Sequence, residues 1–410
     1  MHRGLITALA LAAALVCASD VSARTIYVNA KRPNNKGNGF KVNTAKKTIQ
    51  AAINIAKKGD TILVYPGTYA PIKTNNKKIT IKSVKGQKKT KIVPKANTWT
   101  VADLAKTEAA GNATVLSGFM LDGLYQSHGL YQSRDIGVRC GTVKSCTIQN
   151  LGVAQQHQLG YSSEAHAAEN AFLFDCTIKG CRFYATGGAF IKECTLQRCK
   201  VQGNESDSLV WVGCPLVSDS RLYNCLISGN KHECRDAMFS NSTLINSTVA
   251  KNTFGSDRFT EESRFHNCIL WENRGQNSKE VTKTGPHTEH GYYNENGAWV
   301  VDEEEWDEGY YDGNNNWVAY DYQDRTVNGP YTVWEKVTRI HNVDPDNTYK
   351  NTDKTNKNPK LTSAYKPKKG SYVINKGKLT KTQKKLVGTK DLAGKKRIKG
   401  KAIDRGCYEY

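Results

Sequence analysis

A nine-residue motif recurs through the middle of this chain and constrains its fold more than any other feature. Its copies are LSGFMLDGL from Leu116, VKSCTIQNL from Val143, LFDCTIKGC from Leu173, IKECTLQRC from Ile191, LYNCLISGN from Leu222, LINSTVAKN from Leu244 and FHNCILWEN from Phe265. Successive copies are offset by 27, 30, 18, 31, 22 and 21 residues. A period in the low twenties with insertions of variable length is typical of a solenoid.

Each copy contains a short apolar or β-branched run bounded by Asn, Gly or Ser, which predicts a strand of a few residues. No pattern long enough for a helix separates successive copies. Strands this short must each pair with the equivalent strand of the next repeat, which gives parallel sheets that run along a coil. We therefore expect an all-β protein, a right-handed parallel β-helix.

Equivalent side chains of neighbouring coils should stack in columns, one strand spacing apart. The fourth motif position predicts an interior column of small, mostly sulfur-containing side chains: Phe119, Cys146, Cys176, Cys194, Cys225, Ser247 and Cys268. The ninth position predicts a second column, at a turn: Cys181, Cys199, Asn230, Asn252 and Asn273. We expect the cysteines to be buried thiols, since no CxxC pair or histidine cluster accompanies them. The asparagines should bond the backbone of neighbouring coils.

A solenoid needs its ends covered. Between Thr48 and Gly59, the apolar residues Ile49, Ala52, Ile53 and Ala56 fall at helical spacing, so we expect a helix that covers the N-terminal end. Strands should follow in DTILVYP and KKITIKSVK. We expect a cap with first coils at 24–95, further coils at 96–275, an acidic aromatic insertion at 276–347, and a basic segment at 348–410 that closes the β-helix.

Residues 1–23 contain Arg3, an apolar run from Leu5 to Val16, and small residues up to Ala23, as in a secretory signal peptide. The apolar run is too short for a transmembrane helix. A lipoprotein signal through Cys17 is an alternative, although Val16 fits it poorly. We therefore expect a secreted or cell-surface protein. Without Cys17, 11 of the 12 cysteines remain, so disulfides cannot pair them all within one chain.

The net charge of +21 lies at two places. Residues 24–95 contain 18 Lys or Arg against one acid, and residues 366–401 contain 14 against one. Such segments could attract anionic glycans, or they could serve solubility alone. We do not expect nucleic acid as a partner, because the lysines lack the interleaved aromatic residues of a nucleic-acid groove. We expect a monomer without a transmembrane segment.

Four stretches together resemble the secreted parallel β-helix proteins of the pectin-lyase-like superfamily. They are YVNAKRPNNKGNG, AKKTIQAAINIAKKGDTILVYPGTY, the LYNCLISGN-type coils, and DLAGKKRIKGKAIDRGCYEY at the C-terminus. The last stretch, with NPKLTSAYKPKKGSYVINKGK before it, resembles choice-of-anchor Q domain proteins. The resemblance implies an extracellular polysaccharide as partner. It does not choose among lyases, hydrolases, epimerases and adhesins.

One hydrolase branch of that superfamily has Gly-His-Gly and Arg-Ile-Lys motifs. This chain lacks the first, and its Arg397-Ile398-Lys399 lies in the tail, which argues against a polygalacturonase-like enzyme. Aspartates precede several apolar runs instead. Asp207, Asp236 and Asp257 would form a column on successive coils, with Arg235 and Arg258 beside it.

Such a carboxylate column could do three things. Asp207 and Asp236 could bind Ca²⁺ that bridges an acidic sugar. The carboxylates could supply the acid and nucleophile of a retaining hydrolase. With Arg235 or Arg258 as base, the column would suit β-elimination from a uronate. Alternatively, each Asp makes only a local hydrogen bond at a turn that leads into a strand.

Two further groups are candidate binding residues. His166 and Glu169 lie in the polar stretch SSEAHAAENAF, which could overhang a cleft or be solvated loop. Trp306, Trp317, Tyr310 and Tyr320 lie in the acidic insertion, where aromatic faces could stack on sugar rings or pack on the solenoid. The leading hypothesis is recognition of an extracellular polysaccharide, with or without lyase or hydrolase activity. The alternative is a non-catalytic surface or adhesion protein.

Overall fold

The computed structural model describes residues 23–94, 100–105, 114–123, 136–152, 166–184, 188–207, 215–232, 234, 236–255, 259–293, 299–301, 309–311, 317–319, 323–340, 358–400 and 402–410. The chain divides into two compact units. One comprises Met1–Gly275 with Arg339–Tyr410, and the other comprises Gln276–Thr338. The two units are described separately below.

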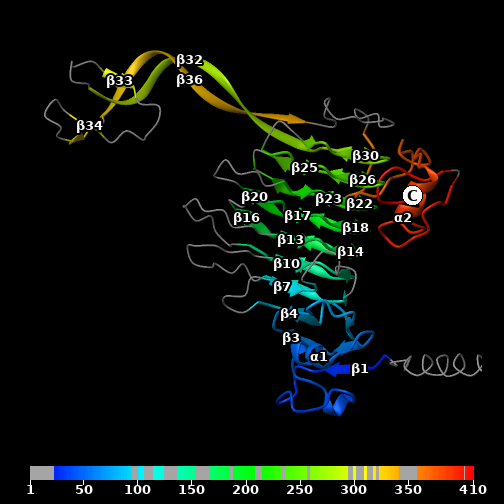
Figure 1. Ribbon diagram of the computed structural model, residues 1–410. Helices are drawn as coiled ribbons and strands as arrows, with labels where there is room; N and C mark the ends of the chain where they lie inside the picture. The colour runs from blue at the N-terminus through cyan, green and yellow to red at the C-terminus, as the bar shows by residue number, and fades with distance from the viewer. Residues whose placement is uncertain are drawn as a thin grey trace, which may run out of the picture. The chain divides into compact units, whose positions relative to one another are not determined.

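The first unit is a stack of coils whose strands pair in parallel with those of the coils before and after (Figure 1). Along one full coil the chain passes through four sheets, which we call C, A, B and D in that order. Sheet A is formed by β1 (Thr25–Val28), β2 (Thr61–Val64), β5 (Thr80–Ser83), β8 (Val115–Ser117), β11 (Thr142–Lys144), β14 (Phe172–Phe174), β18 (Thr195–Gln197), β22 (Arg221–Tyr223), β26 (Thr243–Ile245) and β30 (Arg264–His266).

The other three sheets of the stack follow the same order of coils. Sheet B contains β3 (Gly67–Tyr69), β6 (Thr90–Ile92), β9 (Met120–Asp122), β12 (Thr147–Gln149), β15 (Thr177–Lys179), β19 (Lys200–Gln202), β23 (Leu226–Ser228), β27 (Thr248–Ala250) and β31 (Ile269–Trp271). Sheet C contains β4 (Ile72–Lys73), β7 (Thr100–Asp103), β10 (Ile136–Arg139), β13 (His166–Glu169), β17 (Ile191–Lys192), β21 (Val217–Ser218), β25 (Phe239–Ser240) and β29 (Thr260–Glu261). Sheet D contains β16 (Arg182–Tyr184), β20 (Glu205–Asp207), β24 (Lys231–His232), β28 (Thr253–Phe254) and the start of β32 (Arg274–Tyr293).

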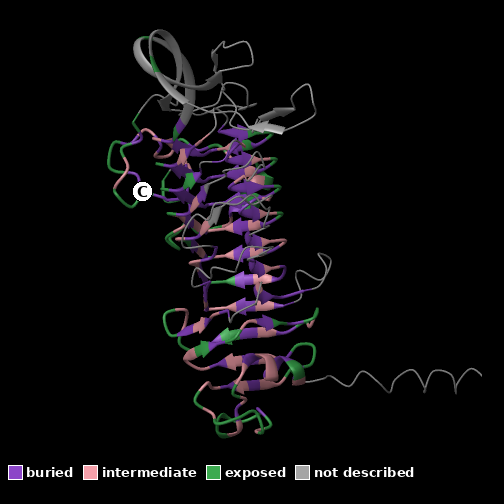
Figure 2. Ribbon diagram, turned by 90° about the vertical axis from the view of Figure 1, so that its left-hand side faces the viewer, coloured by how far each residue is buried: buried purple, intermediate pink, exposed green. Residues whose placement is uncertain are grey.

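The predicted parallel β-helix is confirmed. The inward positions of sheets A and B are apolar and fully buried, for example Ile81, Leu173 and Leu222 in sheet A and Ile148 and Ile227 in sheet B. Figure 2 shows buried residues along the whole stack of coils. Burial of each large apolar side chain stabilises the folded state by about 1.5–3 kcal/mol, and its repetition in every coil makes it the main stabilising contribution.

The register of one predicted repeat is wrong. Ile191–Lys192 is strand β17 of sheet C, and the true copy begins at Leu196, which pairs with Leu173 and Leu222 in sheet A. Cys199, not Cys194, therefore stands in the column with Cys176 and Cys225. The error arose because Cys194 and Cys199 are each followed by a strand-like triplet, TLQ or KVQ, so sequence alone fits either.

Three interior columns turn the corners between sheets. The first has Phe119, Cys146, Cys176, Cys199, Cys225, Ser247 and Cys268 between sheets A and B, and all seven are buried. The second has Cys194, Ser220, Ser242 and Ser263 between sheets C and A. The backbone N–H of each of the first three donates to the serine Oγ of the next coil, at 2.9–3.1 Å.

The third column is an asparagine ladder between sheets B and D, formed by Asn204, Asn230, Asn252 and Asn273. The Nδ2 of each of the first three donates to the Oδ1 of the next asparagine at 2.8–2.9 Å, and all four donate to a backbone carbonyl of the preceding coil. The predicted asparagine bonds to neighbouring coils are confirmed. Because these amides are buried and paired, each substitution would leave a polar group unsatisfied, at about 1–3 kcal/mol.

A helix lies at the N-terminal end, as predicted. α1 (Ile49–Ile55) begins after Thr48, whose side chain accepts a hydrogen bond from the Ala51 N–H at 3.2 Å. Lys77 Nζ donates to the carbonyls of Ile53, Asn54 and Ala56 at the helix C-terminus. A cation there pairs with otherwise unsatisfied carbonyls and with the helix dipole. A short 3-10 helix (Val42–Thr44) and β1, which sequence reasoning missed, precede α1.

The C-terminal segment, 358–410, contains α2 (Lys381–Val387) and lies beside the last coils (Figure 1). Its contacts reach from Gln197 to Ile269 along the corner between sheets A and B. The segment therefore lies along the flank of the coils. Its expected role in closing the β-helix stays a prediction.

The second unit, which overlaps the expected acidic insertion, contains two antiparallel strand pairs among its described residues. Strand β32 pairs with β33 (Trp299–Val301) and with β36 (Gln323–Ile340). A separate two-stranded sheet is formed by β34 (Gly309–Tyr311) and β35 (Trp317–Ala319). No helix in the described part of the chain is both long and apolar enough to cross a membrane.

Candidate functional site

The outer face of sheet A carries one column of side chains that is in register through ten coils. The column consists of Tyr27, Leu63, Lys82, Ser117, Lys144, Phe174, Gln197, Tyr223, Ile245 and His266. These side chains point outward, because they alternate along each strand with the fully buried inward residues. The column is open to solvent over the earlier coils and covered over the later ones.

The open part of the column, which we call the open face, combines cations with aromatic rings. Lys82 and Lys144 are exposed, and Phe172 and Phe174 are half-buried in β14. Lys144 Nζ lies 5.8 Å from the centre of the Phe174 ring, within the range of a cation–π contact. The adjacent outward positions hold Thr61, Thr80 and Thr142, whose hydroxyls can donate or accept hydrogen bonds.

The C-terminal segment covers the later part of the same column. Tyr223 and Ile245 are buried in a cluster with Val387 and Ile403, and Leu379 packs against it. Gln197 Nε2 donates to the Leu386 carbonyl at 3.1 Å, at the end of α2. On sheet B, Leu226 is buried with Cys407 and Tyr408. The tail thus removes these outward positions of sheets A and B in the later coils from the surface available to a ligand.

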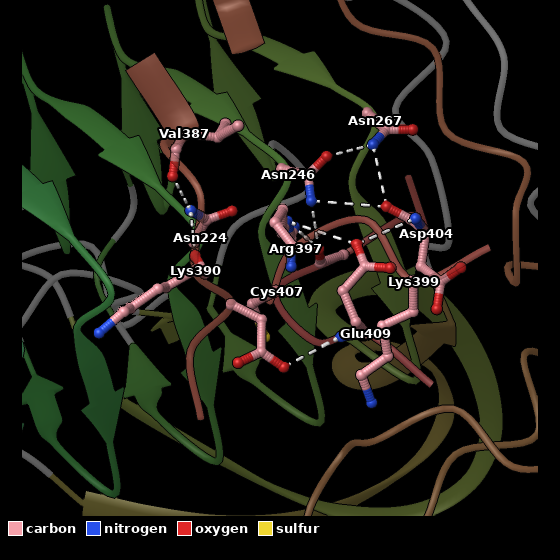
Figure 3. Close-up of polar contacts among 12 residues, drawn as sticks. Asn224, Asn246, Asn267, Val387, Lys390, Arg397, Lys399, Asp404, Cys407 and Glu409 are labelled. Carbon is pink, nitrogen blue, oxygen red and sulfur yellow. Dashed lines mark hydrogen bonds and ion pairs between the residues drawn. The ribbon is translucent and has the colours of Figure 1, made fainter. Parts of the chain in front are cut away.

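Three asparagines at the A–B corner hold the tail in place (Figure 3). Asn224 Nδ2 donates to the Val387 carbonyl at 2.5 Å, and Asn246 Nδ2 donates to the Gly406 carbonyl at 2.6 Å. Asn267 Nδ2 donates to the Asp404 carbonyl at 3.2 Å and to Asn246 Oδ1. All three have a φ of 53–56°, a left-handed conformation that Asn adopts more readily than most residues.

Buried charges organise the tail itself. Arg397 is 2% exposed, donates from Nη2 to the Gly406 carbonyl at 2.5 Å, and lies 3.5 Å from Glu409 Oε1 through Nε. Asp391 and Asp404 are also buried and accept backbone N–H groups of the tail. Burial raises the pKa of Glu409 to about 7, an effect larger than the opposing one of Arg397. Burial lowers the pKa of Arg397.

The buried cysteine thiols of the interior are unreactive. Nine of the described cysteines are buried thiols, while Cys234 is in a disulfide whose other half lies outside the described residues. Burial raises the pKa of Cys181 and of Cys194 to about 12. A protonated thiol is a poor nucleophile and a poor metal ligand, so these cysteines fill the core, as predicted.

The predicted alignment of Asp207 with Asp236 is wrong. Asp207 ends β20 of sheet D, directly after Ser206, which pairs with His232. Asp236 lies four residues beyond His232 and three before β25, so the two aspartates occupy different places in their coils. Asp236 is half-buried. Asp257, Arg235 and Arg258 lie outside the described residues, and so does the side chain of Asp207. Their catalytic roles stay predictions.

His166 and Glu169 lie in strand β13, not in an overhanging loop. His166 is 2% exposed, and its Nδ1 bonds the Ala189 carbonyl at 2.5 Å. Glu169 belongs to an alternating column of charge on sheet C: Lys73, Asp103, Arg139, Glu169 and Lys192. Arg139 and Asp103 are joined at 2.9 Å, which raises the pKa of Arg139. Because positive and negative side chains alternate along this column, their charges largely cancel, and the column has little net charge to attract a ligand.

The remaining predicted binding residues belong to the second unit. Tyr310 is in β34 and Trp317 in β35, with side chains that are not described, while Trp306 and Tyr320 lie outside the described residues. Among the described residues, no three or more His, Cys, Asp or Glu side chains are arranged to hold a metal ion. The Ca²⁺ site through Asp207 and Asp236 required equivalent places in adjacent coils, and the register of the two residues does not provide them.

Sequence reasoning missed the open face, although a signal for it exists. In the corrected register, the second motif position is the outward residue of sheet A: Lys144, Phe174, Gln197, Tyr223, Ile245 and His266. The third position, Asn in the last three copies, marks the attachment of the tail. Comparing positions two and three between copies, and not only the cysteine, would have found both.

No family model and no curated protein matches the chain. Solved structures do resemble it. The crystal structure of pectate lyase Pel9A is 15% identical with a TM-score of 0.43, over 94% of this chain and 96% of that one. A PL6 family polysaccharide lyase from Pseudopedobacter saltans is 15% identical with a TM-score of 0.30, over 52% and 58%. The pectin methylesterase from Aspergillus niger is 11% identical with a TM-score of 0.34, over 61% and 85%.

These likenesses concern the parallel β-helix only. Identities and TM-scores this low carry no inference about activity, because unrelated functions share the fold.

Proposed function

We propose that this is an exported protein that binds an acidic extracellular polysaccharide along the open face of sheet A. The observation that carries the proposal is the outer column of the earlier coils, where Lys82, Lys144 and Phe174 stand in one register. The finer resemblance to choice-of-anchor Q proteins, and export through residues 1–23, are part of the same proposal.

The chemistry of the open face suits a polyanion. Lys82 and Lys144 are two strand steps apart, roughly 10 Å, so a linear glycan lying along the solenoid would meet them in succession. Phe174 offers a ring against which the apolar face of a sugar can pack. Residues 24–95, with a formal charge of +17, surround the first coils and would attract a polyanion at long range.

Binding can be tested with the mature protein on polygalacturonate and alginate, with a neutral glucan for comparison. We expect Lys144→Glu to weaken binding to the acidic polymers at least tenfold and Phe174→Ala about fivefold. Lys179→Glu is the matched control, since Lys179 is an exposed lysine of sheet B in the coil that contains Phe174. It should change affinity less than threefold. Equal losses for Lys144→Glu and Lys179→Glu would show that only net charge matters and would refute a site on sheet A.

Catalysis is a separate prediction. Unsaturated products absorbing in the ultraviolet would indicate a lyase, and new reducing ends without that absorbance a hydrolase. If either product appears, Asp207→Asn, Asp236→Asn and Asp257→Asn, made singly, would show which of these aspartates carries the activity, since Asp207 and Asp236 do not stand in one column. Binding without any product supports the adhesion alternative.

A further inference from the structure

The second unit contains a tandem repeat of its own. Residues 291–301 read GYYNENGAWVV and residues 309–319 read GYYDGNNNWVA, offset by 18 residues. Both copies place Gly-Tyr-Tyr first, then five residues rich in Asn and Gly, then Trp-Val. No other stretch of the sequence repeats this pattern.

The two copies also have the same backbone register. Tyr293 pairs with Trp299 and Gly291 with Val301, in antiparallel strands. Tyr311 pairs with Trp317 and Gly309 with Ala319, again antiparallel. Each copy is thus a hairpin with a tyrosine and a tryptophan at directly opposed positions. Sequence and topology agree independently that one structural element has been used twice.

A cross-strand aromatic pair stabilises a hairpin by only about 0.2–1 kcal/mol, and one β-branched pair would do as much. Duplication of the same Tyr–Trp pair is better explained by a ligand that itself repeats. A linear polysaccharide is such a ligand, and aromatic residues are the side chains that contact sugar rings over a broad apolar face. Two equivalent subsites gain avidity on one polymer.

The charge of the segment selects the kind of polymer. From Thr284 to Asp324 the sequence has no lysine or arginine, and residues 302–324 alone carry nine acids. A polyanion of the kind proposed for sheet A would be repelled here. We propose that the two hairpins form a two-subsite binding module for an uncharged linear polysaccharide, separate from the open face. The inference does not rest on the proposed function of sheet A.

The test uses the full mature protein, retained on insoluble cellulose and chitin and retarded in gels containing mixed-linkage β-glucan. Trp299→Leu and Trp317→Leu should each lower affinity for the polymer at least tenfold, and the double variant should lose binding. Trp334→Leu, in β36 but outside the repeat, is the matched control and should retain wild-type affinity. Trp→Tyr at either repeat position should restore most of the binding, which separates loss of the aromatic face from misfolding.

Stoichiometry sharpens the result. A short oligosaccharide of the retained polymer should bind at two sites in the wild type and at one site in either single Leu variant, by calorimetry. Polygalacturonate binding, measured in parallel, should be unchanged in all hairpin variants, so failure here and failure of the sheet A proposal are distinguishable.

Three outcomes would overturn the inference. The wild type could retain no uncharged polymer, Trp334→Leu could lose as much affinity as the repeat variants, or the repeat variants could lose polygalacturonate instead. If the wild type binds no glycan but self-associates, and the double variant does not, then the acidic hairpins bind the basic coils of a second copy.

Discussion

The A–B corner has the same backbone in the earlier and the later coils, but different side chains. Ser145, Asp175 and Arg198 have a φ of 51–56°, as do the corner asparagines of the last three coils. In the earlier coils Ser145 and Asp175 are exposed and Arg198 is half-buried, and Asp175 pairs with Arg198 of the next coil at 2.7 and 2.8 Å. In the later coils, buried Asn side chains bind carbonyls of the tail. The geometry of the coil therefore determines the backbone conformation at the corner. The side chain found there depends on whether solvent or the tail covers it.

The largest expected effect comes from the buried charge of the tail. Arg397→Met should destabilise the tail by about 3–5 kcal/mol, because it leaves Glu409, Asp391 and Asp404 without their buried cation. Limited proteolysis should then cut residues 358–410 quickly while the coils stay resistant. Lys396→Met, an exposed neighbour, should leave cleavage unchanged. If Arg397→Met releases nothing, the tail is held by its corner contacts alone.

A pair of reciprocal substitutions compares the two kinds of corner directly. Asn246→Asp should cost about 2–4 kcal/mol, because it replaces two donors by acceptors that face the Asp404 and Gly406 carbonyls. Asp175→Asn, the same change in reverse at an exposed corner, should cost less than about 1 kcal/mol. Both residues tolerate the left-handed conformation, so backbone strain cancels. Equal shifts in urea unfolding would contradict the distinction between covered and open coils.

The smallest expected effect is a dependence on pH. The folded-state pKa of Glu409 is raised to about 7 from an ordinary value of 4.5, so the folded tail binds this proton more tightly than the unfolded chain. The corresponding stability is fully present below pH 4.5 and is lost as pH rises through 7, on the order of 1–2 kcal/mol. Glu409→Gln, whose amide oxygen can still accept the Asp404 N–H, should flatten this slope between pH 5 and pH 8 in thermal melts. A steeper slope in that variant would refute the assignment.

The fold was predictable because its signal is repeated. The solenoid, the buried cysteines, the asparagine ladder and α1 each follow from residues that recur at fixed offsets or at helical spacing. The register at Cys194 was not predictable from the sequence, because the corners before and after β18 both accept a small side chain followed by a strand-like triplet. Only pairing with Leu173 and Leu222 resolves it.

The site was less predictable for a different reason. The role of Asn246 depends on Gly406, 160 residues away, and no local sequence pattern predicts such a contact. The open face likewise exists only by contrast with the covered coils. The charge of the aspartates near strands predicts a shared column, yet Asp207 and Asp236 differ in their place within the coil.

Among the described residues, the tail contacts the coils from Gln197 onward, and α1 contacts the first coils. Between these two ends the strands of each coil pair with those of the coils before and after, so a whole coil could be gained or lost there with little change at either end. Duplication of a single coil would lengthen the open face by one strand spacing, roughly 4.8 Å. The architecture thus lets evolution adjust the length of the binding surface in whole-coil increments while its two ends stay unchanged.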